Sequence, residues 1–299
     1  MELSTYNAAH DDVTLRDAGH FGRFRVTGAD AAALLHHLTT NDIKKLKSGE
    51  ACDAALVTSK ARLLDVVSVL RDDSGFLVIT SPNRRAGFAP HAQKFILYRQ
   101  DVKIEDVTET THLFGVFGPN AGTVVAEIEN KAATTRLPFG GFWLFGGEDL
   151  GARLRASGKP FVDGDTYNVL RVEAGIGAAG LEIGEDFNPW EANLDANLSL
   201  SKGCYNGQEV IARLNTYKKV KQKLKGLKLA APIPMGQACA LKVNGRTVGA
   251  ISSSVESPRL GAIALAYVRS THAVAGTPVE VERAEETQTA TVADLPFIA

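Results

Sequence analysis

The sequence predicts an α+β protein in two parts, a body of mixed helices and strands at residues 1–217 and a small all-β domain or barrel at 218–299. Three observations support this prediction. The chain has 299 residues, and a domain usually takes roughly 150, so about two domains are expected. Strand-like and helix-like patterns alternate in the first part, whereas short strands with turn signals follow one another in the second. A run of lysines marks the boundary, at Lys218, Lys219, Lys221, Lys223 and Lys225.

The first half of the body combines helical and strand patterns. A helix is predicted at 30–38, because four apolar side chains share one helical face and Asp30 stands near its start. The apolar runs 62–70 and 76–80 predict a hairpin with its turn at 73–75. The remaining predictions are a strand at 21–26, a short apolar run at 51–57, and a helix at 84–98 interrupted near Pro90.

The second half of the body continues the alternation. Its predicted elements are strands at 102–107 and 112–118, a helix near 120–129, an apolar segment at 142–146, and helices at 148–156 and 166–175. In the last helix Asp165 is the predicted N-cap and Gly175 the C-terminal stop.

A further helix is predicted at 188–197 from a capping-box pattern. Asn188 would cap it, Pro189 would take the first helical position, and Glu191 follows three residues after the cap. Another helix is expected to begin after Gly207, led by Gln208 and Glu209.

The C-terminal part has the pattern of an all-β domain. Strand-like runs occur at 223–229, 238–243, 246–252, 261–269 and 277–284. Asn244-Gly245 between two of them is the signal of a two-residue hairpin turn. Short strands with such turns are typical of a small barrel.

Composition and charge indicate an ordinary globular protein. Hydrophobic residues make up 44% and charged residues 22%, enough for a core without a metal or a disulfide. The net charge of -1 provides no global attraction to nucleic acid or to a membrane surface. The lysine run alternates with Val220, Gln222 and Leu224, the pattern of a strand with one solvated face, and no aromatic residue interleaves to stack bases. No segment is apolar over the length needed to cross a bilayer. We therefore expect no nucleic-acid and no membrane partner.

The cysteines indicate a reducing compartment. Cys52, Cys204 and Cys239 are odd in number and far apart in sequence, so no disulfide framework is expected. The N-terminal stretch MELSTYNAAHDD is polar and acidic, unlike a signal or transit peptide. The expected location is the cytoplasm.

Residues 175–180, GIGAAG, match the glycine pattern of dinucleotide-binding loops. That site needs a strand before the loop and a helix after it, whereas here a helical pattern precedes the loop. The glycines are better explained as a helix stop that allows close approach of the backbone.

Two acidic residues stand in unusual places. Glu173 falls in the last turn of a predicted helix, where the helix dipole disfavours a carboxylate by about 0.3–1 kcal/mol. It is either simply exposed or directed at a donor-rich ligand. Asp65 lies in the apolar run LLDVVSVL and must face water, find a donor or shift its pKa. It is either on the solvent face of a half-buried strand or a functional acid.

The stretch SKGCYNGQEVIAR places Cys204 just before a helix N-terminus and close to Lys202. Both features stabilise a thiolate and lower the thiol pKa below its free value of about 8.5. In the alternative, Cys204 packs inward from a tight turn, like the small apolar residues that Cys52 and Cys239 are expected to be. No histidine neighbours Cys204 in sequence, and no CxxC or HExxH occurs, so no zinc site is expected.

Several stretches resemble one family. KGCYNGQE (202–209) resembles the KGCYxGQE signature of the YgfZ-type folate-binding proteins, which serve iron–sulfur protein maturation. Residues 22–43 resemble the opening of that family and of the related aminomethyltransferase, the T-protein of glycine cleavage. LRVEAG (170–175) is similar to the motif whose glutamate contacts the pterin, and 248–269 and 295–297 resemble the C-terminal barrel. The similarity extends nearly from end to end.

The resemblance implies two interleaved α/β subdomains and a β-barrel around a central folate-binding hole. It implies that Glu173 binds the N–H donors of the pterin and that Asp65 and Asn83 lie near the folate. Aminomethyltransferases carry an Asp-Asp pair where this chain has Asp65 and Val66. They also carry a segment without cysteine where this chain has 201–209.

The expected function is that of a tetrahydrofolate-binding protein that assists the assembly or repair of iron–sulfur clusters, with iron–sulfur proteins or assembly factors as partners. Cys204, activated by Lys202, would act as a thiolate nucleophile or transient ligand, and Gln208 and Glu209 would orient its loop or cap the helix. The enzymatic alternative is an aminomethyltransferase that moves a one-carbon unit from a lipoyl-carried aminomethyl group to tetrahydrofolate, with Asp65 in the reaction. A third possibility is a scaffold with a vestigial folate pocket.

Overall fold

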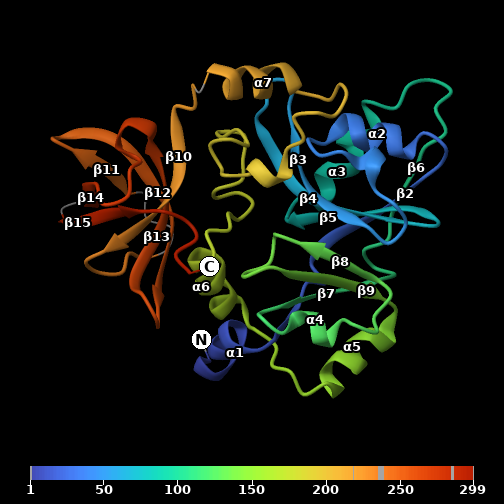
Figure 1. The fold of residues 1–299 in the computed structure, drawn as a ribbon, viewed down its shortest axis with the longest axis horizontal. Coiled ribbons are helices and arrows are strands. Elements are labelled where there is room, and N and C mark those ends of the chain that lie inside the picture. The colour runs from blue at the N-terminus through green and yellow to red at the C-terminus, as the bar shows by residue number, and fades with distance from the viewer. Residues whose placement is uncertain (1, 218, 235–238, 284–285, 299) are drawn as a thin grey trace.

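The computed structural model describes residues 2–217, 219–234, 239–283 and 286–298. Lys218, Ala238 and Ala284, which belong to predicted segments, lie outside this part of the chain. The described residues form two open sheets and a closed barrel. Figure 1 shows the barrel on one side, the two sheets on the other, and helix α6 (Gly164–Glu173) with the segment after it in between.

The first sheet has the strand order β3-β4-β5-β2-β6. Its strands are β2 (Phe21–Thr27), β3 (Ala51–Val57), β4 (Leu63–Asp72), β5 (Gly75–Pro82) and β6 (Lys103–Asp106). Helices α2 (Ala31–Leu38) and α3 (Arg85–Gln93) cover one face of it. Val67 and Val69 of β4 pack with these helices, whereas Val66 and Leu70 join the apolar cluster on the other face. Burial on both faces explains the nearly unbroken apolar run of β4.

The second sheet has the order β1-β7-β9-β8. Its strands are β1 (Thr14–Asp17), β7 (His112–Phe117), β8 (Lys131–Thr134) and β9 (Gly141–Gly146), and helices α4 (Ala121–Val124) and α5 (Glu148–Ala156) pack against it. β1 pairs with β7, although the next strand along the chain, β2, belongs to the first sheet. The chain therefore enters one subdomain, crosses to the other and returns, which confirms the expected interleaving.

The third body is a closed six-stranded barrel of order β10-β13-β12-β11-β14-β15. Its strands are β10 (Gln222–Leu229), β11 (Ala240–Val243), β12 (Arg246–Ser257), β13 (Gly261–Arg269), β14 (Pro278–Arg283) and β15 (Glu286–Ala293). Asn244 and Gly245 connect β11 and β12 with φ values of 51° and 72°, the backbone that a two-residue hairpin of this type requires. The prediction of a C-terminal β-barrel is confirmed.

The remaining helical elements connect these bodies. They are α1 (Leu3–Asp11), α7 (Gln208–Tyr217) and the short 3₁₀ turns η1 (Ile43–Lys45), η2 (Asp195–Asn197) and η3 (Ser270–His272). In Figure 1, α7 bridges the top of the molecule between the first sheet and the barrel, and α1 lies beside α6 near the C-terminus.

Some predicted boundaries were wrong. The helix near 120–129 is reduced to Ala121–Val124, and the helix at 84–98 continues through Pro90 but ends at Gln93. The N-cap of α6 is Asp163 rather than Asp165, because the Asp163 side chain accepts the Thr166 N–H at 2.7 Å. The stop at Gly175 is confirmed by its φ of 70°.

The predicted helix at 188–197 is also wrong, although its capping box forms. Asn188 Oδ1 accepts the Glu191 N–H at 3.1 Å, and the Glu191 side chain accepts the Asn188 N–H at 3.1 Å. The chain then continues in turns, because Asn193 takes a φ of 57° and barrel strand β10 uses the local polar groups. Leu224 donates its N–H to the Glu191 carbonyl, and the Asn193 side chain donates to the Leu224 carbonyl. Tertiary contacts thus replace the helical hydrogen bonds that the local pattern favours.

The barrel is fixed to the body through Tyr267 of β13. Its ring stacks on Phe187 with centroids 3.5 Å apart and planes at 8°, and its hydroxyl donates to the Glu182 carbonyl at 2.8 Å. An aromatic pair with a satisfied hydroxyl gives both contact area and a defined orientation. No helix among the described residues is long and apolar enough to cross a membrane.

Gly249 of β12 lies directly against the backbone of Tyr267. A Cβ at this position would be 2.2 Å from the Tyr267 carbonyl oxygen, so Gly249→Ala must shift β13 and the stacked pair. We expect a loss of about 1–3 kcal/mol in the free energy of unfolding, measured by urea denaturation. Gly122→Ala, on exposed α4 where nothing lies within 4 Å, is the control and should change stability little. Equal stability of Gly249→Ala and the wild type would contradict this docking geometry.

Candidate functional site

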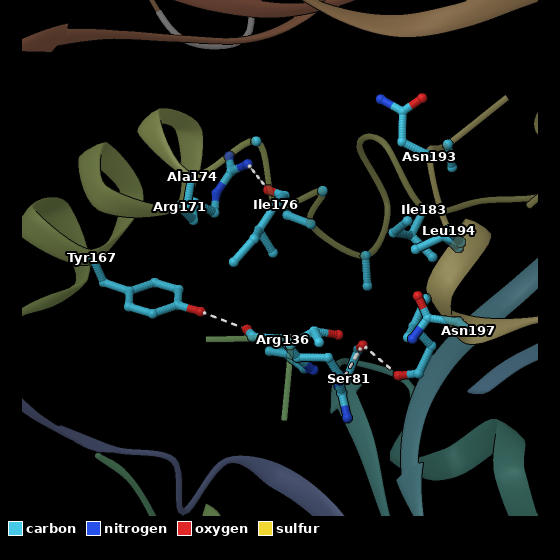
Figure 2. Close-up of a pocket in the computed structure, with 18 of the residues that line it drawn as sticks. Ser81, Arg136, Tyr167, Arg171, Ala174, Ile176, Ile183, Asn193, Leu194 and Asn197 are labelled. Atoms are coloured by element: carbon cyan, nitrogen blue, oxygen red, sulfur yellow. Dashed lines mark hydrogen bonds between the residues drawn. The ribbon is translucent and has the colours of Figure 1, made fainter. Parts of the chain in front are cut away.

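A cavity of about 470 Å³ lies where the two subdomains meet helix α6 and the segment that follows it. Helix α6 supplies one wall between Gly164 and Arg171, and the backbone of 174–179 continues that wall. Figure 2 shows Ile183, Leu194 and Asn197 opposite this helix, with Ser81 and Arg136 between the two sides. The cavity therefore draws on parts of the chain far apart in sequence, as expected of a central hole.

The lining of the cavity is apolar and cationic. Phe21, Tyr167 and several aliphatic side chains provide apolar surface, and Arg16, Arg136 and Arg171 provide charge. Among the described residues, no Asp or Glu belongs to the lining. This arrangement suits a partly apolar ligand that carries negative charge.

Arg136 is held firmly from behind the cavity. Its guanidinium donates to the Ile79 carbonyl and the Ser81 hydroxyl, each at 2.9 Å, and to the Ser68 hydroxyl at 3.1 Å. Tyr167 donates its hydroxyl to the Arg136 carbonyl at 3.3 Å, as Figure 2 shows. Burial lowers the pKa of Arg136, and the nearby carboxylates of Asp65 and Asp53 oppose that shift.

Asp65 is 3% exposed and lies behind the lining, whereas the next residue, Val66, reaches the cavity. Its carboxylate accepts the Val66 N–H at 2.8 Å and the Ser81 N–H at 3.0 Å. Burial raises the pKa of Asp65, against the charge of Arg136 and the hydrogen bonds from Ser81 and Val66. Asp65 is thus not on a solvent face. Its catalytic role stays a prediction.

Glu173 is fully buried at the junction of four segments. Its carboxylate accepts the Tyr6 hydroxyl at 2.7 Å and the Ser257 hydroxyl, and it lies 2.9 Å from His10 Nε2. Its backbone carbonyl accepts the Phe297 N–H at 2.8 Å. The carboxylate is engaged by protein donors and does not line the cavity, so binding of the pterin by Glu173 stays a prediction.

The partners of Glu173 could not be predicted from the sequence. Helix α1, which carries Tyr6 and His10, was not predicted, because its nine residues show no clear apolar stripe. Burial of the phenol raises the pKa of Tyr6, and the hydrogen bond to the buried Glu173 carboxylate adds to the shift. The position of Glu173 at a helix end was the only hint that this acid has special partners.

A second buried carboxylate, Glu182, was not singled out from the sequence. It pairs with Arg171 at 3.4 Å, accepts the Ser253 hydroxyl at 2.6 Å and accepts the Ala178 N–H at 2.8 Å. Burial lowers the pKa of Arg171, and Glu182 opposes the shift. This pair fixes the loop 174–179 against the barrel, which agrees with the sequence-based view that GIGAAG is a close-packed loop.

Asn83 is exposed, with a φ of 62°, and it does not line the cavity, although its neighbours Ser81 and Pro82 do. Its contact with a folate stays a prediction. A left-handed backbone at asparagine is the usual sign of a tight turn, and this position follows directly after strand β5.

Lys202 is 5% exposed, and its ammonium closes the end of helix α2. It donates to the backbone carbonyls of His36, Thr39 and Asn41 at 2.6, 2.7 and 2.6 Å. Burial lowers its pKa to about 8, so the cation persists at neutral pH. The side chain thereby anchors the loop of Cys204 to α2, a contact that spacing alone did not reveal.

Cys204 is exposed at the surface and lines neither this cavity nor the second one described below. The inward-packed alternative is therefore wrong. Asn206 fixes the loop by donating its N–H to the His37 carbonyl and its side chain to the Val57 carbonyl. His36 Nε2 would lie 3.9 Å from a Cβ on Gly203, so the fold brings a histidine to this loop that the sequence did not. Activation of Cys204 by Lys202 stays a prediction.

A second cavity, of about 440 Å³, shares Thr135, Ala196 and Asn197 with the first. Cys52 lies in its wall, half-buried, and burial raises the pKa of its thiol to about 12. Asp53 beside it accepts hydrogen bonds from Ser68, Thr134 and Thr135. Cys239, in contrast, is buried in the barrel core, as expected of a small apolar residue.

Comparison with known proteins gives consistent matches. The GCVT N-terminal domain matches residues 3–162, and the glycine cleavage T-protein C-terminal barrel domain matches residues 222–298. A chloroplastic protein of Arabidopsis thaliana named as a transferase is 30% identical over 98% of this chain and 73% of its own length. The aminomethyltransferase of Thermotoga maritima is 28% identical over 87% of this chain and 79% of its own.

A solved structure has the same architecture. The crystal structure of the glycine cleavage system aminomethyltransferase T from Bartonella henselae matches with a TM-score of 0.85, covering 99% of this chain and 89% of that chain. At 22% sequence identity, this similarity concerns the fold.

The anchoring role of Lys202 can be tested by substitution. Lys202→Met leaves three carbonyls, two of them in buried hydrogen bonds, without their donor, and we expect the free energy of unfolding to fall by at least about 2 kcal/mol. Hydrogen exchange of the amides at 202–206 should accelerate. Lys60→Met, at an exposed position, is the matched control. Unchanged exchange in 202–206 would show that the loop is held by other contacts.

Proposed function

The chain belongs to the glycine cleavage T-protein family, and we propose that it binds a tetrahydrofolate in the central cavity and uses Cys204 to assist the assembly or repair of iron–sulfur clusters. The family assignment follows from the two domain matches and the Arabidopsis relative. The finer assignment, to the YgfZ-type branch, rests on KGCYNGQE at 202–209.

The observation that carries the folate part is the cavity itself. Its volume of about 470 Å³ falls in the range of small-molecule sites. Ile176, Ile183 and Leu194 offer apolar surface for a flat ring. A tetrahydrofolate combines such a ring with a negatively charged tail, which fits a lining with three arginines.

The thiol part is supported by the separation of Cys204 from the cavity. The loop is anchored by Lys202 and Asn206, while Cys204 itself is exposed. A fixed surface thiol can meet a group on another macromolecule, and thiolates are the usual protein ligands of iron–sulfur clusters. The proposed partners are therefore iron–sulfur proteins or their assembly factors. We place this role in the cytoplasm or another reducing compartment, because Cys52, Cys204 and Cys239 are all free thiols.

The second candidate function is aminomethyl transfer to tetrahydrofolate. The relative from Thermotoga maritima that carries the name aminomethyltransferase favours it. The geometry favours it less, because both carboxylate oxygens of Asp65 accept main-chain N–H groups. Val66, and not Asp65, lines the cavity. Proton transfer to a ligand would need a carboxylate within hydrogen-bond reach of it.

Folate binding can be measured by calorimetric titration with 5-formyltetrahydrofolate. We expect a dissociation constant below about 1 mM for the wild type. Ala174→Phe adds a ring at the cavity wall and should weaken binding at least about tenfold. Ala152→Phe, on the exposed face of α5, is the matched control and should bind as the wild type does. No binding at millimolar ligand would favour the vestigial scaffold.

The thiol can be tested by complementation of a deletion strain. Cys204→Ser should fold and bind folate normally but fail to restore iron–sulfur enzyme activity. Cys52→Ala is the matched control, because the thiol it removes has a pKa raised to about 12 and does not ionise at neutral pH.

Two outcomes would redirect the proposal. Full complementation by Cys204→Ser would remove the thiol from the function. Turnover in a glycine-cleavage assay that is lost in Asp65→Asn would favour the aminomethyltransferase.

A further inference from the structure

The three arginines of the central cavity differ in how their charge is compensated. Arg171 pairs with Glu182 at 3.4 Å, and Arg136 lies near Asp65 and Asp53 and donates three hydrogen bonds. Both therefore have counter-charges behind the cavity wall. The guanidinium groups of Arg171 and Arg136 are thus already engaged by protein partners.

Arg16 stands apart from these two. In the ranges that the structure describes, its guanidinium makes no ion pair and no hydrogen bond. It lies over the ring of Tyr167, 3.4 Å from the centroid, and is 5.2 Å from the centroid of Phe21. The side chain is half-buried and lines the cavity.

Stacking explains the position of Arg16 but leaves its hydrogen-bonding capacity unused. A cation–π contact of this kind is worth about 0.5–2 kcal/mol. A guanidinium carries five N–H donors in a rigid plane, and a planar ring beneath it keeps that plane in place. The donors at its edge are thus oriented in advance for a planar acceptor such as a carboxylate.

The surrounding charge also favours an anion at this point. The charge of Arg16 acts on Arg136 and Arg171 and contributes to the lowering of their pKa values, after the larger effect of burial. No carboxylate among the described lining residues offsets this positive cluster. An anionic ligand group beside Arg16 would relieve the mutual repulsion of the three cations.

We infer that Arg16 is the anion anchor of the cavity and pairs with a carboxylate on the glutamate tail of the bound folate. This inference rests on the proposed folate binding and names the residue that recognises the charged part of the ligand. Arg16 would thereby fix which end of the ligand lies at β1 and would favour folates over pterins without a carboxylate.

The test compares the binding of 5-formyltetrahydrofolate to the wild type and three variants by calorimetry at two salt concentrations. Arg16→Gln removes the charge and should weaken binding about 10- to 100-fold, the usual effect of losing a hydrogen bond to a charged group. The affinity of the wild type should fall as salt rises, and that of Arg16→Gln should respond less. Arg16→Lys keeps a charge without the planar fork and should retain the salt response at reduced affinity. Arg246→Gln, at the exposed start of β12, is the charge-matched control.

Each result decides between clear alternatives, and thermal unfolding checks that each variant is folded. Affinity of Arg16→Gln within twofold of the wild type would overturn the role of Arg16 and leave the proposed function intact. Weaker binding with an unchanged salt response would overturn it as well, because Arg16 would then act through Tyr167 and not through charge. If Arg16→Gln does not fold, loss of the salt response in Arg16→Lys overturns the inference. Absence of binding to the wild type would overturn the proposed function, and with it this inference.

Discussion

The carboxylate of Glu173 is the point on which the arrangement of the three bodies depends. It is fully buried and receives hydrogen bonds from Tyr6 of α1 and Ser257 of β12, with His10 beside it. A charge in such a place is tolerated only when donors surround it. The same residue accepts the Phe297 N–H through its carbonyl. One residue at the end of α6 thereby joins the N-terminal helix, the barrel and the C-terminal segment.

The central cavity follows from this arrangement. Helix α6 forms one wall of it, and Glu173 and Arg171 hold the C-terminal end of this helix against the barrel, through Ser257 and Ser253. The acids are used in these structural contacts, so the side chains left at the cavity surface are aromatic, aliphatic and cationic. For the same reason Glu173, which was predicted to bind the ligand, lies behind the cavity wall. Arg16, which was not singled out from the sequence, lies at the cavity surface.

Much of the fold could be predicted from sequence, and several of the exceptions depend on contacts between residues far apart in the chain. The strands β2, β4 and β5, the helices α2 and α6 and the barrel strands before β15 follow local periodicity, and the structure contains them, with β12 extended to Ser257. Helix α1, strand β1 and the path of 188–197 do not, because their partners are distant in sequence. For the site, local pattern identified Glu173, Asp65 and Lys202 as unusual. It could not show that Lys202 closes a helix 163 residues away, since that contact exists only after the chain has folded back.

The interleaved path of the chain has a consequence for its synthesis. Helix α1 emerges before the strands, yet Tyr6 meets its partner 167 residues later, and strand β1 must wait for β7. Contacts between such distant residues carry a large loop-closure cost before they return any stabilisation. A ribosome-bound chain that ends before α6 already holds every strand of the two sheets, but the N-terminal helix remains without Glu173 until α6 has been made. The docking of α1 and of the C-terminal segment is therefore expected late in synthesis, because both meet the same residue, Glu173.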